Sequence, residues 1–385
     1  MRPVYLDVTR LLKGILFRKR ATGVDRVSLA YVRHYGEDAR AVLAARGHHF
    51  AVSHQASRRL FDVIKHYYED DGRVEKFQLA NALLSSARSR IERGGVLIHT
   101  SHSGAEFDRY FRSLKLNGVD VVFMVHDLIP LTHASYCRAG TAQVHERRLR
   151  SALSMSSGII ANSRATLDDM TGYAASNGFR VPPAVVAKLA PGTEIANDAT
   201  APIAGPYFVM VGTIEPRKNH LLILDVWRRM VKRLGASAPK LVVIGREGWK
   251  CSNVIELLKN NALWQGTVAW YPDCPDTALG GWLKHARALL FPSFTEGYGM
   301  PVAEALAGGV PVIASDLSVL REYASDIPDY LDPLDLASWQ ARIMAYSDVD
   351  SPERAQQLAR LVRFQVPTWE RHFEQVDRLL ADLGS

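Results

Sequence analysis

Short apolar runs rich in valine and isoleucine alternate with longer amphipathic stretches along the chain, and this alternation restricts the possible folds more than any other feature. The runs lack the period of two that a half-exposed strand shows, so they predict strands buried on both faces. Buried strands alternating with helices indicate parallel sheets covered by helices on both sides. The predicted strands are Pro3–Val8, Val96–Thr100, Val119–Asp127, Ser157–Ser163, Tyr207–Thr213, Lys240–Gly245, Thr267–Tyr271, Ala286–Ser293 and Gly309–Asp316.

The chain has 385 residues, which is too long for one ordinary core and favours two domains. The segment Ala190–Pro206 is rich in alanine, proline, glycine and threonine and lacks periodicity, so it marks the boundary. We therefore predict an α/β fold of two doubly wound Rossmann-like domains, residues 1–195 and 206–365, with a ligand cleft between them. The amphipathic stretch Thr368–Leu383 predicts a terminal helix.

Composition indicates a soluble globular protein, with 47% hydrophobic and 23% charged residues and no apolar run near the ~18 residues of a membrane span. The net charge of +7 comes from interleaved bases and acids without a recognition motif, so we expect no nucleic-acid partner. The 3 cysteines resemble neither a disulfide framework nor a zinc site, which favours the cytoplasm, and we expect no signal peptide. The apolar-basic stretch Leu11–Arg20 is the candidate for contact with an anionic membrane face.

The stretch Val211–His220, VGTIEPRKNH, carries a basic pair between a strand and a helix. Gly212 and Thr213 form the turn, and Arg217 and Lys218 stand where a phosphate meets a helix N-terminus. A planar guanidinium and an ammonium together suit a diphosphate. The alternative is a solvent-facing basic pair, which the helix dipole disfavours at that position.

A second loop, Phe294–Met300, carries one carboxylate, Glu296, and Glu304 follows about one turn into the next helix. Free backbone N–H groups of the loop suit an anion, whereas carboxylates suit neutral hydroxyls beside it. A sugar nucleotide combines both, with Glu304 on the ribose and Glu296 near the sugar. For Glu304 the alternative stays open that it only complements the helix N-terminus.

With these motifs the chain resembles the family 4 (group 1) glycosyltransferases, which are retaining enzymes with the GT-B fold, and in particular bacterial polysaccharide mannosyl- and rhamnosyltransferases. The resemblance rests on Gly212–His220 and on the Glu-x7-Glu spacing of Glu296 and Glu304. Further matches are Val125–Leu131, Ala161–Met170 and Thr368–Val376. The resemblance implies that the first domain binds the acceptor, that the second binds the nucleotide sugar, and that residues 366–385 cross back to the first domain.

The resemblance also implies roles for individual residues, and it implies neither a metal nor a cofactor. The implied catalytic residues are His126, Glu296, Arg217 and Lys218. The implied donor-binding residues are Gly212, Thr213, Arg217, Lys218, Glu296, Gly297, Tyr298, Gly299, Met300 and Glu304. The implied acceptor-binding residues are Gly23, Arg26, His102 and Asp127. For His126 the alternative is a strand-end histidine bonded to the backbone.

One region departs from the family pattern. Members often place a Gly-Gly turn directly after the first strand, where it touches the donor phosphate. Here no glycine pair follows Val4–Val8, and Gly14 and Gly23 are both candidates for that contact. The stretch Thr22–Val32 resembles a variant in which a Thr-Gly turn opens the first helix.

The expected function is transfer of a sugar, mannose from GDP-mannose, to a lipid-linked surface glycan, with retention of configuration and in association with the inner face of the membrane. Alternatives are a dTDP- or UDP-sugar donor, a nucleotide-sugar epimerase or glycoside phosphorylase on the same architecture, and a non-catalytic polyanion-binding protein. No G-x-G-x-x-G follows a predicted strand, which disfavours a dinucleotide-dependent oxidoreductase.

Overall fold

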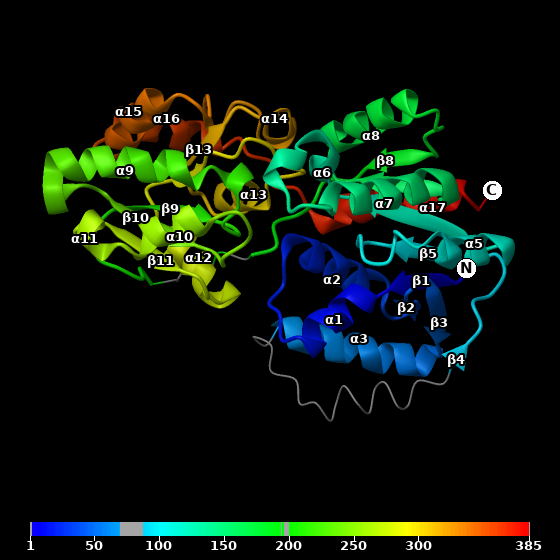
Figure 1. Ribbon diagram of the computed structural model, residues 1–385. Coiled ribbons are helices and arrows are strands. Elements are labelled where there is room, and N and C mark those ends of the chain that lie inside the picture. The colour runs from blue at the N-terminus through cyan, green and yellow to red at the C-terminus, as the bar shows by residue number, and fades with distance from the viewer. Residues whose placement is uncertain (1, 70–87, 194, 196–199, 385) are drawn as a thin grey trace. The chain divides into compact units, whose positions relative to one another are not determined.

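The computed structural model describes residues 2–69, 88–193, 195 and 200–384, and it divides into two compact units (Figure 1). Unit 1 comprises Met1–Leu131, Gly140–Leu189 and Thr368–Ser385. Unit 2 comprises Thr132–Ala139 and Ala190–Pro367. Part of the linker predicted at 190–206, namely 194 and 196–199, lies outside the described residues.

Unit 1 is built on a sheet with the order β4-β3-β2-β1-β5-β6-β7-β8, within the described residues. All its pairings are parallel except those of β3, which runs antiparallel to both neighbours. The strands are β1 (Val4–Asp7), β2 (Arg40–Ala45), β3 (His48–Val52), β4 (Arg88–Ser89), β5 (Val96–His99), β6 (Asp120–Val125), β7 (Gly158–Ala161) and β8 (Ala184–Val186).

The antiparallel edge of this sheet is absent from the sequence-based prediction. A two-residue turn joins β2 to β3, and its residues Arg46 and Gly47 have φ angles of 49° and 82°. Two successive positive φ angles produce the twist that a tight hairpin requires. An Arg-Gly pair is a weak indicator of such a turn, so the hairpin is hard to predict from the sequence.

Helices cover both faces of the unit 1 sheet. On one face α5, α7 and α8 pack against the strands in a single apolar cluster that includes Phe111, Leu149 and Met170. The terminal helix α17 packs on β7, where Gly158 lies against Leu379, and Figure 1 shows it in red among the green elements. The helices are α1 (Thr9–Leu16), α2 (Gly23–Tyr35), α3 (His54–Glu69), α5 (Asp108–Leu116), α6 (Ile129–Thr132), α7 (Thr141–Met155), α8 (Arg164–Ser176) and α17 (Trp369–Asp382).

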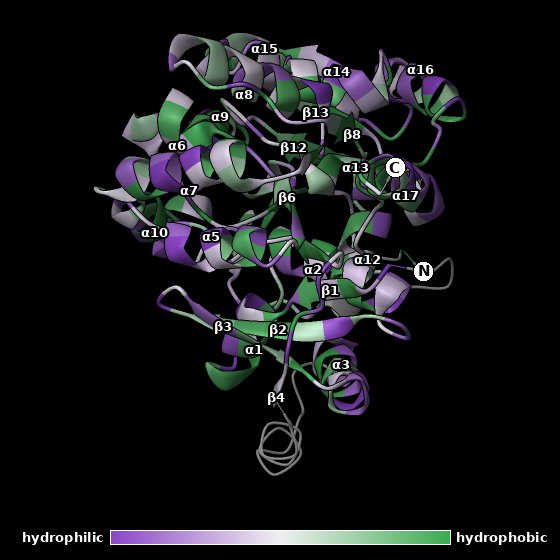
Figure 2. Ribbon diagram, turned by 90° about the vertical axis from the view of Figure 1, so that its right-hand side faces the viewer, coloured by the Kyte–Doolittle hydropathy of each residue, from purple (hydrophilic) through white to green (hydrophobic). Residues whose placement is uncertain are grey.

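Unit 2 contains a fully parallel sheet with the order β11-β10-β9-β12-β13-β14. Figure 2 shows hydrophobic strands such as β12 and β13 inside, with helices that carry a hydrophilic side. The strands are β9 (Tyr207–Val211), β10 (Lys240–Ile244), β11 (Val268–Tyr271), β12 (Leu289–Phe291), β13 (Val312–Ser315) and β14 (Asp329–Leu331). The helices are η1 (Ala134–Tyr136), η2 (Pro216–Lys218), α9 (His220–Leu234), η3 (Gly235–Ser237), α10 (Ser252–Lys259), α11 (Asn261–Trp264), α12 (Asp276–Lys284), α13 (Met300–Ala307), α14 (Ser318–Ala324), α15 (Leu336–Ser347) and α16 (Pro352–Leu361).

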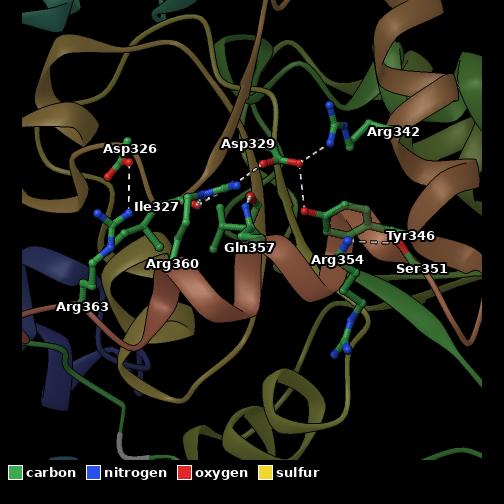
Figure 3. A network of polar contacts seen from close by, with 11 residues as sticks. Asp326, Ile327, Asp329, Arg342, Tyr346, Ser351, Arg354, Gln357, Arg360 and Arg363 are labelled. Carbon is green, nitrogen blue, oxygen red and sulfur yellow. Dashed lines mark hydrogen bonds and ion pairs between the residues drawn. The ribbon is translucent and has the colours of Figure 1, made fainter.

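A polar network holds α15 and α16 to the edge strand β14 (Figure 3). The carboxylate of Asp329 pairs with Arg342 at 2.7 Å and with Arg360 at 2.5 Å, and it accepts a hydrogen bond from the Tyr346 hydroxyl at 2.8 Å. Gln357 on α16 bonds the backbone at the start of β13 through both ends of its amide. Buried polar groups are thus paired at the edge of the sheet. No helix in the described part of the chain is long and apolar enough to cross a bilayer.

Candidate active site

The loops that follow β9 and β12 meet at the carboxyl edge of the unit 2 sheet. These two strands are neighbours in the sheet although β10 and β11 come between them in the chain, so the strand order reverses at this point. Open α/β sheets bind ligands outside the carboxyl ends of their strands at such a reversal. The Phe294 N–H donates to the Arg217 carbonyl at 2.8 Å, and the Arg217 guanidinium donates to the Thr295 carbonyl at 3.1 Å. The two sequence motifs are therefore joined in one site.

A buried charge cluster lies at the centre of this site. The two oxygens of Glu296 contact Arg217 Nη1 at 2.7 Å and Lys218 Nζ at 2.6 Å. Arg217 also pairs with Glu215 at 2.5 Å through its other terminal nitrogen. The Glu296 side chain is only 7% exposed, so these pairs are screened weakly. Two cations and two carboxylates thus pair with one another in this cluster.

The cluster determines which of its acids is charged. Burial raises the pKa of Glu296, but the charges of Arg217 and Lys218 outweigh burial and bring it down to about 2. Burial raises the pKa of Glu215, against the attraction of Arg217. Burial also lowers the pKa of the Lys218 ammonium, against the attraction of Glu296. Glu296 is therefore a carboxylate at neutral pH, which accepts hydrogen bonds and does not serve as a proton donor.

Gly212 and its neighbours allow this cluster to form. Gly212 has a φ of 140°, and a Cβ atom added there would lie 3.4 Å from Lys218 Cε. Gly245, which directly follows β10, lies so close to the Gly212 backbone that a Cβ atom on Gly245 would lie 1.9 Å from the Gly212 carbonyl oxygen. Thr213 packs against Gly248 in the same loop pair. Gly212 and Thr213 thus have evident structural roles, and a contact with donor remains a prediction.

The loop before α13 is fixed by aromatic packing. Tyr298 stacks on Tyr323 with ring centroids 4.9 Å apart, and the Tyr323 hydroxyl donates to the Gly299 carbonyl at 3.0 Å. Gly299 has a φ of 89° and precedes the helix, which begins at Met300. A side chain at Gly299 would be strained and would clash with Leu320. Gly297 lies between Glu296 and the stacked Tyr298, so the loop has a defined shape.

Glu304 lies in α13 and is 1% exposed. Its Oε1 atom accepts a hydrogen bond from the backbone N–H of Gly192 at 3.3 Å. Glu304 therefore does more than complement the helix N-terminus, because it also holds the backbone at Gly192, near the beginning of the unit 2 segment Ala190–Pro367. The predicted contact with ribose hydroxyls remains a prediction.

Three histidines gather at the carboxyl edge of the unit 1 sheet. The rings of His126 and His145 lie 5.3 Å and 5.2 Å from that of His102. Burial lowers the pKa of all three, and the neighbouring histidines lower that of His102 further. His126 Nε2 lies 2.8 Å from the Thr100 carbonyl, which can only accept, so Nε2 carries the proton. A neutral His126 consequently offers Nδ1 as a hydrogen-bond acceptor.

The other predicted acceptor residues have structural partners in unit 1. Asp127 accepts the Ile129 N–H at 3.1 Å at the start of α6. Gly23 is the first residue of α2 and Arg26 is in its first turn. The predicted alternative glycine, Gly14, is inside α1, where the Tyr68 hydroxyl occupies the space that a side chain would need. Gly14 is thus a packing position.

The sequence-based prediction did not include two residues of these clusters. Glu215 stands two positions before Arg217 and pairs with it. The only sign of this pair in the sequence is the short spacing between the acid and the base. His145, on α7, donates from Nε2 to the Asp127 carbonyl, 3.1 Å away. Nothing in an amphipathic helix marks that histidine from sequence alone.

Comparison with known proteins agrees with this geometry. Residues 193–327, which contain the whole charge cluster, match the family described as glycosyl transferases group 1. The serotype-specific mannosyltransferase WbdA of Escherichia coli is 25% identical over 294 residues, which cover 71% of this chain and 35% of WbdA. The O-antigen chain mannosyltransferase RfbU of Salmonella typhimurium is 32% identical, over 36% of this chain and 37% of its own.

The chain spans 35% of the length of the first of these relatives. Among solved structures, Anabaena HepE in complex with UDP and glucose is similar over 99% of this chain and 100% of its own, with a TM-score of 0.67 and 12% identity. A likeness at this identity shows the fold alone. The fold is GT-B, with two doubly wound units, as the sequence predicts.

Proposed function

We propose that this chain is a retaining glycosyltransferase that uses a nucleotide-sugar donor. The observation that carries the proposal is the buried cluster of Glu296, Arg217 and Lys218 at the strand-order reversal of unit 2. A purely structural ion cluster gains little from burial, because desolvation offsets the attraction. This cluster lies where open α/β sheets bind ligands. A ligand that replaces one carboxylate as the partner of the cations therefore explains the cluster better.

In the proposed mechanism the donor diphosphate binds Arg217 and Lys218. A diphosphate attracts both cations more strongly than one carboxylate does, so it takes over part of the pairing that Glu296 provides. When the bond from the sugar to the diphosphate breaks, negative charge develops on the leaving nucleotide, and the two cations stabilise it. The basic pair thus favours departure of the nucleotide.

Glu296 then accepts hydrogen bonds from hydroxyls of the transferred sugar. Its depressed pKa keeps it ionised, and the fixed loop from Gly297 to Met300 supplies backbone N–H groups beside it. Glu304 binds the ribose hydroxyls through the carboxylate that now holds Gly192. The phosphate, ribose and sugar parts of the donor each have a partner in unit 2.

On the acceptor side, His126 accepts a hydrogen bond at Nδ1 from a sugar hydroxyl. His102, Asp127, Gly23 and Arg26 contribute to acceptor binding in unit 1. This assignment uses the neutral state of His126, which burial favours. His126 orients the hydroxyl, and its low basicity makes it a weak proton acceptor.

For the donor we propose GDP-mannose and for the acceptor a lipid-linked surface glycan. The relatives named as mannosyltransferases support this choice, and two of them are named O-antigen chain mannosyltransferases. The structural neighbours solved with UDP favour a UDP-sugar as the second candidate, and a dTDP-sugar is the third. The exposed Leu16 and Phe17 beside the basic residues 18–20 support contact with the anionic inner face of a membrane.

The test is a thermal-shift and hydrolysis screen with GDP-mannose and with UDP-, dTDP- and ADP-sugars. Stabilisation by one nucleotide class, together with slow release of that nucleotide, supports the transferase. Glu296→Ala should abolish hydrolysis, and Glu256→Ala, an exposed glutamate of unit 2, should retain it. Binding of polyanions without nucleotide selectivity, unaffected by Glu296→Ala, would instead support the non-catalytic alternative.

A further inference from the structure

A short segment between two helices of unit 1 belongs to unit 2 by its packing. The segment Thr132–Ala139 begins at the end of α6 and stops before α7, and it forms part of unit 2 together with Ala190–Pro367. The chain on either side of it, up to Leu131 and from Gly140, forms part of unit 1. The contacts that hold the segment in unit 2 therefore need an explanation.

The backbone of this segment is held by the loop that follows β10. Trp249 Nε1 donates to the Tyr136 carbonyl at 2.7 Å, and Lys250 Nζ donates to the Ser135 carbonyl at 2.9 Å. The Arg138 guanidinium lies over the Trp249 ring, 5.4 Å from its centre. Two hydrogen bonds to successive carbonyls and one cation–π contact give the segment a defined position on this loop.

The loop after β10 is in turn joined to the loop after β9, which carries the basic pair of the donor site. The Ile214 N–H donates to the Arg246 carbonyl at 3.0 Å, and the Gly248 N–H donates to the Ile214 carbonyl at 3.1 Å. Glu215, the next residue after Ile214, pairs with Arg217. The segment Thr132–Ala139 thus packs on a loop that supports the buried charge cluster.

The ring of Tyr136 contacts the second loop of the donor site. It stacks on Phe294 with ring centroids 5.4 Å apart and planes inclined by 6°. The Phe294 N–H donates to the Arg217 carbonyl, and the next residue, Thr295, accepts from the Arg217 guanidinium. Through its backbone and through Tyr136 the segment therefore contacts both loops that hold Arg217.

Tyr136 supports the loop Phe294–Met300 at its beginning. The later part of this loop is fixed by the stacking of Tyr298 on Tyr323. An offset aromatic pair at the beginning restricts Phe294, and with it the two hydrogen bonds that orient Arg217. A guanidinium that is oriented before the ligand arrives loses less entropy when it binds.

We propose that Tyr136 is a positioning residue of the donor site, which holds Phe294 and through it keeps Arg217 oriented for the donor diphosphate. The inference rests on the proposed function for the identity of the ligand. The segment follows α6, whose Ile129 N–H is bound by Asp127. The donor site therefore receives one support from the stretch of chain that directly follows a predicted acceptor residue.

The test compares wild type with three variants of Tyr136. Tyr136→Phe keeps the ring, Tyr136→Leu keeps apolar volume without an aromatic face, and Tyr136→Ala removes both. Tyr271→Ala is the matched control, because it removes another tyrosine of unit 2 that contacts an aromatic ring, Trp282, with centroids 4.8 Å apart. GDP and UDP are titrated by calorimetry. Hydrogen exchange of the Phe294 amide is followed by mass spectrometry in the absence of nucleotide.

We expect Tyr136→Ala and Tyr136→Leu to weaken the binding of GDP or UDP by roughly threefold to tenfold, the range that the loss of one aromatic pair supports. The Phe294 amide should exchange faster in both variants. Tyr136→Phe and Tyr271→Ala should retain the affinity and the exchange rate of wild type. A merely structural tyrosine would change the unfolding temperature and leave the affinity of the folded protein unaltered.

Folded Tyr136→Ala or Tyr136→Leu with wild-type nucleotide affinity would overturn the proposal, and Tyr136→Leu decides the matter if Tyr136→Ala does not fold. An equal loss of affinity in Tyr136→Phe would also overturn it, because the ring would then not be the decisive group. If wild type binds neither nucleotide, the proposed function fails, and exchange of the Phe294 amide decides about Tyr136 separately. Faster exchange in the Ala and Leu variants then supports the positioning of the loop, and unchanged exchange overturns it.

Discussion

The carboxylate of Glu296 lies 2.6 Å from the ammonium of Lys218, although 78 residues separate them in the chain. Lys218 Nζ also lies 4.6 Å from the centre of the Phe291 ring, so the ammonium is enclosed by a carboxylate and an aromatic face. The pair joins the two loops at the carboxyl edge of the unit 2 sheet. Substitution of Glu296 or Lys218 therefore tests the donor site.

Glu296→Gln keeps the shape of the side chain and removes its charge. We expect the rate of donor hydrolysis or transfer to fall by roughly a hundredfold or more, because a fixed charge beside the reacting sugar is lost. The binding of free GDP or UDP should persist, since Arg217 and Lys218 remain. Steady-state kinetics and nucleotide titration check this, and full activity of the variant would contradict the role of Glu296.

Glu296 should also give the protein an acid-sensitive stability. Its pKa is about 2 in the folded protein, against 4.5 for an ordinary glutamate, so its ion pairs stabilise the fold fully above pH 4.5. That contribution is lost as the pH falls from 4.5 toward 2. The difference in the free energy of unfolding between wild type and Glu296→Gln should shrink over this window in urea titrations. A difference that is independent of pH would show that Glu296 is not selectively stabilised in its charged form.

His372 on α17 should make the stability of unit 1 fall at mildly acidic pH. It accepts the Tyr31 hydroxyl hydrogen bond at 2.9 Å and lies 3.1 Å from the Lys188 carbonyl, and burial lowers its pKa to about 4. The unfolded chain takes up a proton near pH 6.5, so stability is lost as the pH falls from 6.5 toward 4, by about 2 kcal/mol at pH 5. His372→Gln should flatten this dependence in urea unfolding. The exposed His54→Gln should leave it unchanged.

Asp329 is expected to stabilise the edge of the unit 2 sheet. Its carboxylate is 10% exposed and binds Arg342, Arg360 and Tyr346. Asp329→Ala should therefore lower the free energy of unfolding by about 1–3 kcal/mol, because the buried Tyr346 hydroxyl and the two half-buried arginines lose their acceptor. Asp326→Ala removes an exposed pair with Arg363 and should have no measurable effect. Equal unfolding midpoints for the two variants would contradict the importance of this network.

The sequence predicts the repeating strands and helices well because buried parallel strands are marked by uninterrupted apolar runs. The predicted strand Tyr207–Thr213 corresponds to β9 (Tyr207–Val211), and the predicted terminal helix Thr368–Leu383 corresponds to α17 (Trp369–Asp382). The hairpin at Arg46 and Gly47 was not predicted, because its turn needs two positive φ angles and an Arg-Gly pair is a weak indicator of them. Short edge strands such as β14 carry too few residues to show a pattern.

For the site, sequence motifs identify Arg217, Lys218 and Glu296 but not their mutual pairing. The sequence suggests separate partners for phosphate and sugar, whereas the structure shows the carboxylate bound to both cations. Such pairing depends on which strands are neighbours in the sheet, and this is a long-range property. The stacking of Tyr136 on Phe294 has the same origin, since it depends on the packing of Thr132–Ala139 with unit 2.

The most direct test of the donor-diphosphate assignment is calorimetric titration of GDP and UDP into wild type, Arg217→Ala and Lys218→Ala. We predict that wild type binds at least one of these nucleotides and that each substitution weakens binding by roughly tenfold to a hundredfold, as expected for a lost charge-assisted contact to phosphate. The exposed Arg228→Ala on α9 should bind as wild type does. Nucleotide affinities that are the same in wild type and in both variants would contradict the assignment of this cluster as the site of the donor diphosphate.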